Sequence, residues 1–225
     1  MLLAVLFCGA LAIVLAHHTA ALSNLRPAEL ANEPRVLLPA QFIAYFLLLV
    51  ALWRLFSHHY RIGFFRGLCW QWPARWSRFL AFGVLLAVIV QFASHWLPAP
   101  PELPIDKLMR TPLDAWLMSV FGVLIAPFVE EVLFRGMLFP ALARRTGVLL
   151  SLVATSALFG ATHAEQLAGA WVQITLIMLV GAVLTGIRWK YHSLASSTLV
   201  HMGYNGTLFA AIFVQTHAFT HLSQH

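Results

Sequence analysis

The sequence is poor in charged residues and in cysteine. Only 10% of its 225 residues are charged and 60% are hydrophobic, whereas soluble domains carry about 25% charged residues. Such a chain cannot cover a water-facing surface, so its composition excludes a soluble enzyme, a disordered tail and a coiled coil. The two cysteines, Cys8 and Cys69, form no CxxC pair and no framework of disulfides. We therefore expect an all-α polytopic membrane protein.

Acidic residues are also scarce, since 14 Lys and Arg accompany only 8 Asp and Glu and give a net charge of +6. A basic balance is typical of nucleic-acid-binding proteins, but these carry their charge on one face of a soluble module. In this sequence the Arg residues lie between apolar runs. We expect the lipid bilayer as a partner, and no nucleic acid.

Apolar runs of spanning length predict about seven transmembrane helices. A spanning helix needs about 20 apolar residues. The first run could also be a signal peptide, but it has neither a basic N-terminal region nor an A-x-A cleavage site. No internal repeat or low-complexity linker divides the chain, which indicates one structural domain. The predicted spans are residues 2–16, 37–56, 79–97, 113–134, 147–163, 168–187 and 191–214.

The loops between these helices differ in charge, which predicts the orientation of the chain. The second, fourth and sixth connections hold nine Lys and Arg residues and no Asp or Glu, whereas the other connections mix both signs. Because basic loops stay in the cytoplasm, we expect a cytoplasmic N-terminus and an outer C-terminus. Short loops and the lack of an evident organelle signal favour a bacterial inner membrane.

Two adjacent carboxylates follow an apolar stretch inside the fourth predicted span. A charged side chain at the bilayer centre costs about 2.5–3.5 kcal/mol on insertion scales, so Glu130 and Glu131 need a reason to be there. Consecutive helical residues point about 100° apart, so the two carboxylates cannot share one role. Arg135 lies four residues from Glu131, which favours that pairing. A purely structural ion pair beside one protonated Glu remains the simpler alternative.

Two further polar sites fall inside predicted spans. His163 ends the fifth span, and His201 and Asn205 lie four residues apart on one face of the seventh. A lone His in a span is more often a packing residue than a catalytic one. At about 1.5 Å rise per residue, however, these residues and Glu130 fall in one band between the bilayer middle and the outer leaflet. This common depth predicts one buried polar site.

The same residues resemble the three motifs of the CPBP intramembrane proteases, also called Abi or CAAX-protease-like. Glu130-Glu131-x-x-x-Arg135, Phe159-x-x-x-His163 and His201-x-x-x-Asn205 occur in the family's order. The family includes the type II prenyl endopeptidase, which trims prenylated CAAX proteins. The resemblance implies a catalytic core at residues 113–214, preceded by variable N-terminal transmembrane helices at 1–112 and followed by a short tail at 215–225.

What the resemblance implies is an intramembrane endopeptidase that cuts a membrane-associated protein or peptide. Glu130 would be the general base that activates water, assisted by His163, while His201 and Asn205 would stabilise the tetrahedral oxyanion. This chemistry needs a base and donors aimed at the developing oxyanion, which these residue types supply. Three further residues are expected to support the site, namely Glu131, Arg135 and Phe159.

Other readings of these residues remain open. Glu130, His163 and His201 could hold zinc with water in the fourth position. We favour a site without metal or other cofactor, because Asn205 is a poor zinc ligand and a good oxyanion donor. Buried Glu and His residues also relay protons in transporters, but transporters often contain repeats. A catalytically silent scaffold or immunity protein is less expected, because the motif set is complete.

Overall fold

The structure is a computed structural model that describes residues 34–98 and 108–222. The predicted first span, residues 2–16, lies outside the described residues. Within them the chain forms helices and turns without any strand, which confirms the all-α prediction. The helices outside the central segment are α3 (Pro34–Arg54), η1 (Leu55–His59), α4 (Phe64–Gly67), α5 (Trp76–Ser94), α9 (Val148–Ala161), α10 (Trp171–Tyr191) and α11 (Leu194–Gln215).

A long central helix runs through the middle of the molecule. Its segments are α6 (Pro112–Val120), η3 (Phe121–Ile125), α7 (Ala126–Glu131), η4 (Val132–Leu138) and α8 (Phe139–Thr146). It begins with a capping box between Thr111 and Asp114, with Pro112 at the first helical position, and Gly147 follows its end with φ 79°. The η segments are π-helical turns. The prediction of a span at 113–134 gave the correct start, but the helix continues to residue 146 because nothing breaks it before Gly147.

Four described helices are long and apolar enough to cross a membrane: Val36–His59, Trp76–Ser94, Pro112–Thr146 and Trp171–Tyr191. They match the second, third, fourth and sixth predicted spans. The seventh, α11, has sufficient length but carries too many polar side chains to meet the same standard. The described residues thus support a membrane protein with four clear spans, and the count of seven stays a prediction.

The fifth predicted span is a shorter helix of 14 residues, about 21 Å long. Its end is fixed by two side chains that follow it. The Thr162 hydroxyl donates to the Phe159 carbonyl at 2.7 Å, and Nδ1 of His163 lies 2.8 Å from the same oxygen. These bonds satisfy a carbonyl that the helix end leaves free, so the chain turns there instead of reaching residue 163 as a helix.

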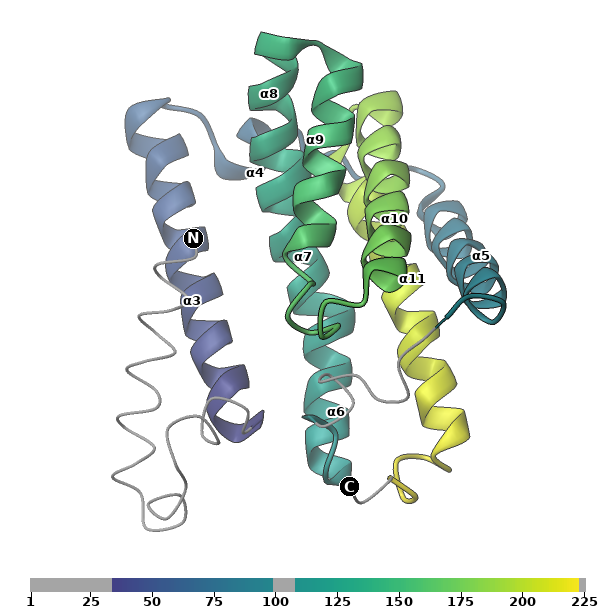
Figure 1. Cartoon of the computed structure of the whole chain (residues 1–225). Coiled ribbons are helices and arrows are strands. Elements are labelled where there is room, and N and C mark those ends of the chain that lie inside the picture. Colours follow the sequence, from purple (N-terminus) through teal and green to yellow (C-terminus); the bar gives the residue numbers. More distant parts are fainter. Residues whose placement is uncertain (1–33, 99–107, 223–225) are drawn as a thin grey trace.

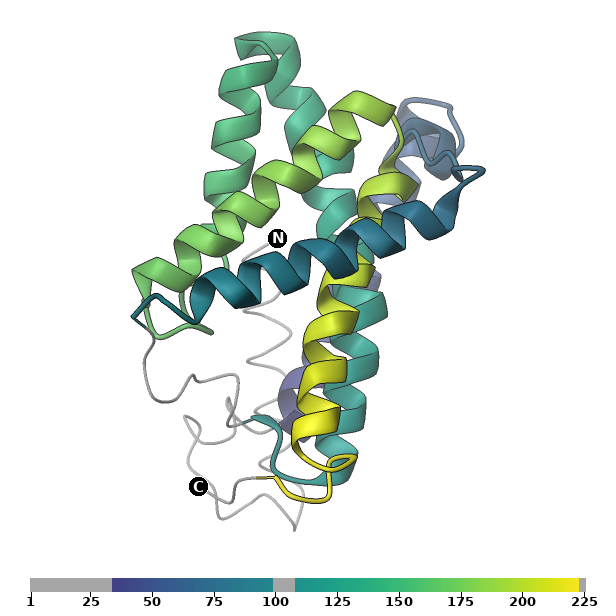
Figure 2. The same ribbon diagram turned by 90° about the vertical axis from the view of Figure 1, so that its right-hand side faces the viewer.

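The helices pack as a bundle around the central helix (Figure 1). α8 and α9 form an antiparallel pair, α9 packs along α10, and α5 crosses α11 obliquely (Figure 2). The α5–α11 crossing depends on glycine: a Cβ on Gly83 would collide with the Val200 carbonyl, and one on Gly203 with the Leu80 carbonyl. Small residues let membrane helices approach closely in this way.

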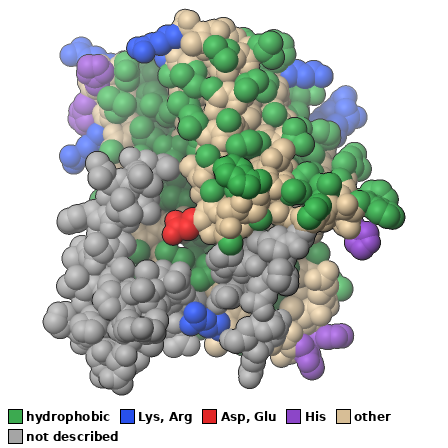
Figure 3. All heavy atoms as spheres, viewed as in Figure 1, with side chains coloured by type: hydrophobic (Ala, Val, Ile, Leu, Met, Phe, Trp, Pro, Cys, Tyr) green, Lys and Arg blue, Asp and Glu red, His purple; other side chains and the backbone are tan. Residues whose placement is uncertain are grey.

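The outer surface is that of a membrane-embedded protein. Hydrophobic side chains cover much of the face shown in Figure 3, while Lys and Arg gather toward the end where α8 meets α9. Large apolar side chains such as Phe92, Leu149 and Trp171 are 70–78% exposed. This exposure suits lipid contact, because water-soluble monomers rarely expose large contiguous apolar patches.

Candidate active site

The two adjacent carboxylates of the central helix point in different directions. The Glu131 side chain is fully buried, whereas that of Glu130 retains 19% exposure. This difference follows from the rotation of about 100° between consecutive helical residues. The pair therefore divides into one carboxylate inside the protein and one that reaches a cavity.

Glu131 forms a buried ion pair with Arg135, whose Nη1 lies 2.8 Å from Oε1 of the carboxylate. The guanidinium also donates to the Gly181 carbonyl at 2.9 Å and to the Thr185 hydroxyl at 3.2 Å. Its carbon lies 4.4 Å from the centre of the Phe159 ring, a cation–π contact. Arg135 thus connects the central helix to α10 and α9, and its charge is compensated on every side.

His201 lies between the two carboxylates. Its Nδ1 is 3.2 Å from Oε1 of Glu131, and its Nε2 is 3.7 Å from Oε2 of Glu130. The Glu131 oxygen already accepts a hydrogen bond from Arg135, and an ionised carboxylate only accepts. The proton of this contact therefore belongs to Nδ1, which directs Nε2 toward Glu130. Glu131 orients the imidazole as carboxylates orient histidines in many catalytic and metal sites.

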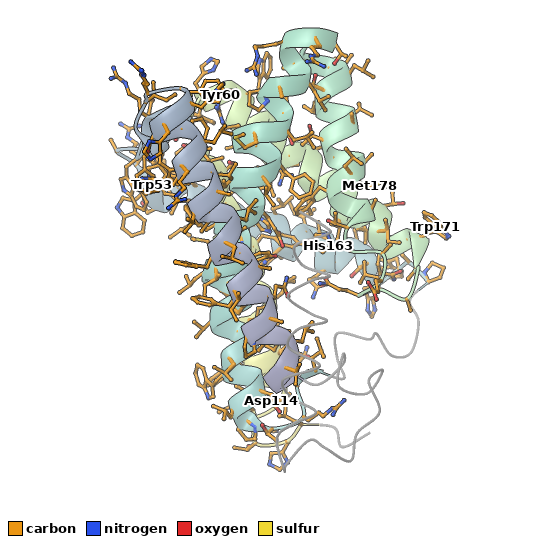
Figure 4. All side chains as sticks on the ribbon, turned by 90° about the vertical axis from the view of Figure 1, so that its left-hand side faces the viewer. Trp53, Tyr60, Asp114, His163, Trp171 and Met178 are labelled. Carbon is orange, nitrogen blue, oxygen red and sulfur yellow. The ribbon has the colours of Figure 1, made fainter. Side chains whose placement is uncertain are left out.

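His163 has an equally defined orientation at the turn after α9, midway along the molecule (Figure 4). Because a backbone carbonyl only accepts, the 2.8 Å contact with Phe159 assigns a proton to Nδ1 of His163. In the neutral imidazole Nε2 then carries a lone pair. The Phe159 ring lies between the two histidines. Its centre is 4.9 Å from the centre of the His163 ring and 5.7 Å from that of the His201 ring.

Asn205 is held by a backbone irregularity in the central helix. Its Nδ2 donates to the Gly122 carbonyl at 2.7 Å. In a regular α-helix that carbonyl would accept from the N–H of residue 126, but the Ala126 N–H bonds to Phe121 in the π-helical turn. Residue 127 is proline and has no N–H. Asn205 therefore supplies the donor that the helix lacks and keeps one amide hydrogen for another partner.

The four predicted catalytic side chains all line one cavity of about 320 Å³: Glu130, His163, His201 and Asn205. Most of its remaining wall is apolar, with Leu37 and Leu38 from α3, Met118 and Phe121 from the central helix, and Leu208 and Ile212 from α11. The structure thus gathers into one site the residues that the sequence places as far as 75 positions apart. Phe159 lines the same cavity, while Glu131 and Arg135 lie behind it.

Some residues of the site gave no sequence signal. Thr185 and the Gly181 carbonyl bind Arg135 from α10, and nothing in their local sequence indicates a partner about 50 positions away. Gly181 could be read only as a close-packing position, which it is: a Cβ there would lie 3.0 Å from the Phe159 ring. Gln41 and Tyr204 also reach the cavity wall but belong to no recognisable motif.

The zinc alternative needs three protein ligands close together in space. Among residues 34–98 and 108–222, no three His, Cys, Asp or Glu side chains are grouped closely enough to hold a metal ion. Glu130 and His201 approach each other, but His163 does not complete a ligand set with them. The described side chains therefore offer no ready set of zinc ligands.

A comparison with protein families identifies this region. Residues 112–207 match the model of the family described as type II CAAX prenyl endopeptidase, Rce1-like. Over these residues the chain is similar to the Rce1-like family. The match covers somewhat less than half of the chain and includes all seven residues singled out above. Comparisons with curated proteins and with solved structures give no match.

The family match and the helices agree on the class of protein. The Rce1-like segment confirms the predicted resemblance to CAAX-type proteases, and the apolar helices around it indicate an integral membrane protein. The Rce1-like assignment implies a membrane endopeptidase acting on a protein or peptide. The match begins at residue 112, so α3 and α5, which precede that residue, are described by the structure alone.

Proposed function

We propose that this Rce1-like protein is a glutamate-dependent intramembrane endopeptidase that hydrolyses a peptide bond of a membrane-associated protein or peptide. The observation that carries the proposal is the position of Glu130. Its carboxylate reaches a mostly apolar cavity, lies 3.7 Å from Nε2 of His201 and shares the cavity wall with His163 and Asn205. A base and oxyanion donors in a site of low polarity are what peptide hydrolysis requires.

The reaction begins with a water molecule between Glu130 and the scissile carbonyl. Glu130 takes one proton from the water as its oxygen attacks the carbonyl carbon, and the lone pair of His163 Nε2 assists by accepting a hydrogen bond. The tetrahedral oxyanion accepts hydrogen bonds from His201 Nε2–H and from the free amide hydrogen of Asn205. The C–N bond then breaks as the proton on Glu130 passes to the leaving nitrogen, which gives an acid and an amine.

The proposed reaction needs protons on both ring nitrogens of His201, because Nδ1 donates to Glu131 and Nε2 donates to the oxyanion. Two positive groups then balance the two carboxylates of the buried cluster, and burying net charge is costly. When Glu130 accepts the proton of water, the cluster gains one positive charge at the moment when the oxyanion forms. His201 and Asn205 can donate to the negative oxyanion without reorganising, because Glu131 and the Gly122 carbonyl already fix their side chains.

We also propose an orientation in which the turn between α8 and α9 is cytoplasmic, with a cytoplasmic N-terminus and an outer C-terminus in a bacterial inner membrane. Arg144 and Arg145 precede that turn, and Arg188 and Lys190 end α10 at the same side of the bundle. Reporter fusions after residue 147 test this placement. An outer location of the reporter would contradict it.

The test of the activity uses purified protein in liposomes and a farnesylated CAAX peptide, with its unprenylated twin for comparison. Mass spectrometry follows the shortening of each peptide at its C-terminus. We expect Glu130→Gln to lower the rate about 100-fold or more, as the loss of a general base does. The matched control is Glu165→Gln, because Glu165 is an exposed carboxylate outside the cavity.

Two outcomes would change the proposal. Equal rates for Glu130→Gln and Glu165→Gln would remove Glu130 as the base. Loss of wild-type activity with a chelator, followed by recovery with zinc, would replace the metal-free mechanism. Cleavage of the unprenylated peptide at the same rate would be consistent with the proposed protease activity and would exclude recognition of the prenyl group.

A further inference from the structure

A second cavity of about 320 Å³ lies at the proposed cytoplasmic end of the molecule. Its walls come from α8, the start of α9 and the end of α10, which meet at one end of the bundle (Figure 1). It shares no lining residue with the cavity of Glu130. Three of its residues are basic or titratable, namely Arg144, Arg188 and His192, and the others are apolar or aromatic.

Arg188 is the unusual member of this group. It is only 8% exposed, and its buried Nε has no hydrogen-bond partner among residues 34–98 and 108–222. The structure gives it no ion pair with any described carboxylate. A buried guanidinium nitrogen without a partner is costly, and the partial negative charge at the end of α10 offsets only a small part of that cost. Arg135 in the same bundle shows the contrast, since every side of its guanidinium is paired.

The surroundings of Arg188 favour pairing with a bound anion rather than with an Asp or Glu side chain of the protein. Arg144 and His192 line the same cavity, so a group that enters it meets hydrogen-bond donors from two guanidinium groups and an imidazole. The described acidic residues lie elsewhere: two at the candidate active site, Asp114 at the start of the central helix and Glu165 at the turn after α9. A phosphate group has the charge and the acceptor oxygens to satisfy an arginine fork.

The apolar part of the wall indicates what carries the phosphate. Phe139, Pro140 and Val148 line one side of the cavity, and the half-exposed ring of Trp189 lies beside Arg188. Trp side chains lie at the headgroup level of membranes, and Lys and Arg clusters there attract anionic lipids. A free phosphate ion would use the donors and leave this apolar wall without a contact.

We propose that the cavity between α8 and α10 binds the phosphate group of an anionic phospholipid of the cytoplasmic leaflet. Arg188 forms the floor of the site and Arg144 and His192 hold the headgroup from the rim. The glycerol and the first acyl carbons lie against Phe139, Pro140 and Val148. This site does not depend on the proposed protease activity.

Native mass spectrometry of the detergent-purified full chain tests the proposal. Dioleoyl phosphatidylglycerol is titrated, with dioleoyl phosphatidylcholine as the zwitterionic comparison and millimolar inorganic phosphate as a competitor. We expect phosphatidylglycerol to bind the wild type more tightly than phosphatidylcholine does. Arg188→Gln should weaken that binding about tenfold, as the loss of a hydrogen bond to a charged group does. The matched control is Arg145→Gln, an exposed neighbour outside this cavity.

Arg144→Gln gives a second variant should Arg188→Gln fail to fold, because Arg144 is exposed and its change cannot disturb the interior. It should weaken phosphatidylglycerol binding while Arg145→Gln does not. Equal binding by Arg144→Gln, Arg188→Gln and Arg145→Gln would overturn the site. A different result would be that inorganic phosphate displaces the lipid from the wild type but not from Arg188→Gln. That result would overturn the lipid as the ligand and leave a site for free phosphate.

Discussion

Asn205 has two separable tasks, and a double-mutant cycle measures both. Its Nδ2 donates to the Gly122 carbonyl at 2.7 Å, which neither Ala126 nor Pro127 serves, because the Ala126 N–H bonds to Phe121 and proline has no N–H. This bond is structural. In the proposed reaction the second amide hydrogen donates to the oxyanion, which would be a catalytic use.

The expected magnitudes differ for the two tasks. Interhelical hydrogen bonds in membrane proteins contribute about 0.6 kcal/mol on average and up to about 1.7 kcal/mol. A buried carbonyl that is left without a donor lowers the stability further. We therefore expect Asn205→Ala to lower the free energy of unfolding by about 1–2 kcal/mol. Loss of one oxyanion donor should lower kcat about 100- to 1000-fold.

Pro127→Ala separates the effects, because it restores a backbone N–H that can donate to the Gly122 carbonyl, in the same register as the bond from Ala126 to Phe121. In this background Asn205→Ala should cost less stability, so the two substitutions should be coupled by about 0.5 kcal/mol or more. Asn205→Ala should lower the rate of peptide cleavage equally with Pro127 and with Ala at that position, since residue 127 does not touch the reacting atoms. Unfolding in detergent with increasing SDS measures the stability of the four proteins.

Two results would refute this reasoning. Strict additivity of Asn205→Ala and Pro127→Ala in stability would mean that the Gly122 carbonyl gains no donor from residue 127. Recovery of the cleavage rate in the double variant would mean that Asn205 acts on activity only by holding the central helix in place.

Three further predictions concern the helices around the site. Glu131→Gln should lower kcat at least about tenfold with a smaller change in KM, because Glu131 orients His201; parallel changes in both constants would contradict this. Arg135→Met should destabilise the protein by about 3–5 kcal/mol, since it removes the arginine partner of the buried Glu131 carboxylate, and adding Glu131→Gln should recover part of the loss in SDS unfolding. Gly203→Val should prevent folding, read by size-exclusion chromatography, because its Cβ collides with a backbone carbonyl of α5, whereas Gly186→Val, which meets nothing within 4 Å, should give a monodisperse protein.

Much of the site follows from helical geometry and is therefore predictable. The spacing of four residues predicts the pairing of Glu131 with Arg135, and the structure has it at 2.8 Å. The rotation between neighbours predicts that Glu130 points away from Glu131, which their different exposure reflects. These are local relations, so they need no knowledge of the fold.

Other features depend on contacts that distant parts of the chain make. The contact of Glu131 with His201 joins residues 70 positions apart, and its distance decides the orientation of the imidazole. The end of α9 has a local cause instead. Its apolar run is long enough for a span, but Thr162 and His163 bond back to Phe159 and end the helix. Hydropathy alone does not detect such bonds.

The π-helical turns connect these two kinds of feature. Each turn accommodates one residue more than an α-helical turn, and so rotates everything that follows by about 100° relative to a regular helix. η3 (Phe121–Ile125) precedes the two carboxylates. A regular helix from Pro112 would therefore turn Glu130 away from its present direction and place Val129 there. The turn that leaves Gly122 in need of Asn205 is thus the same turn that directs Glu130, rather than Val129, into the cavity.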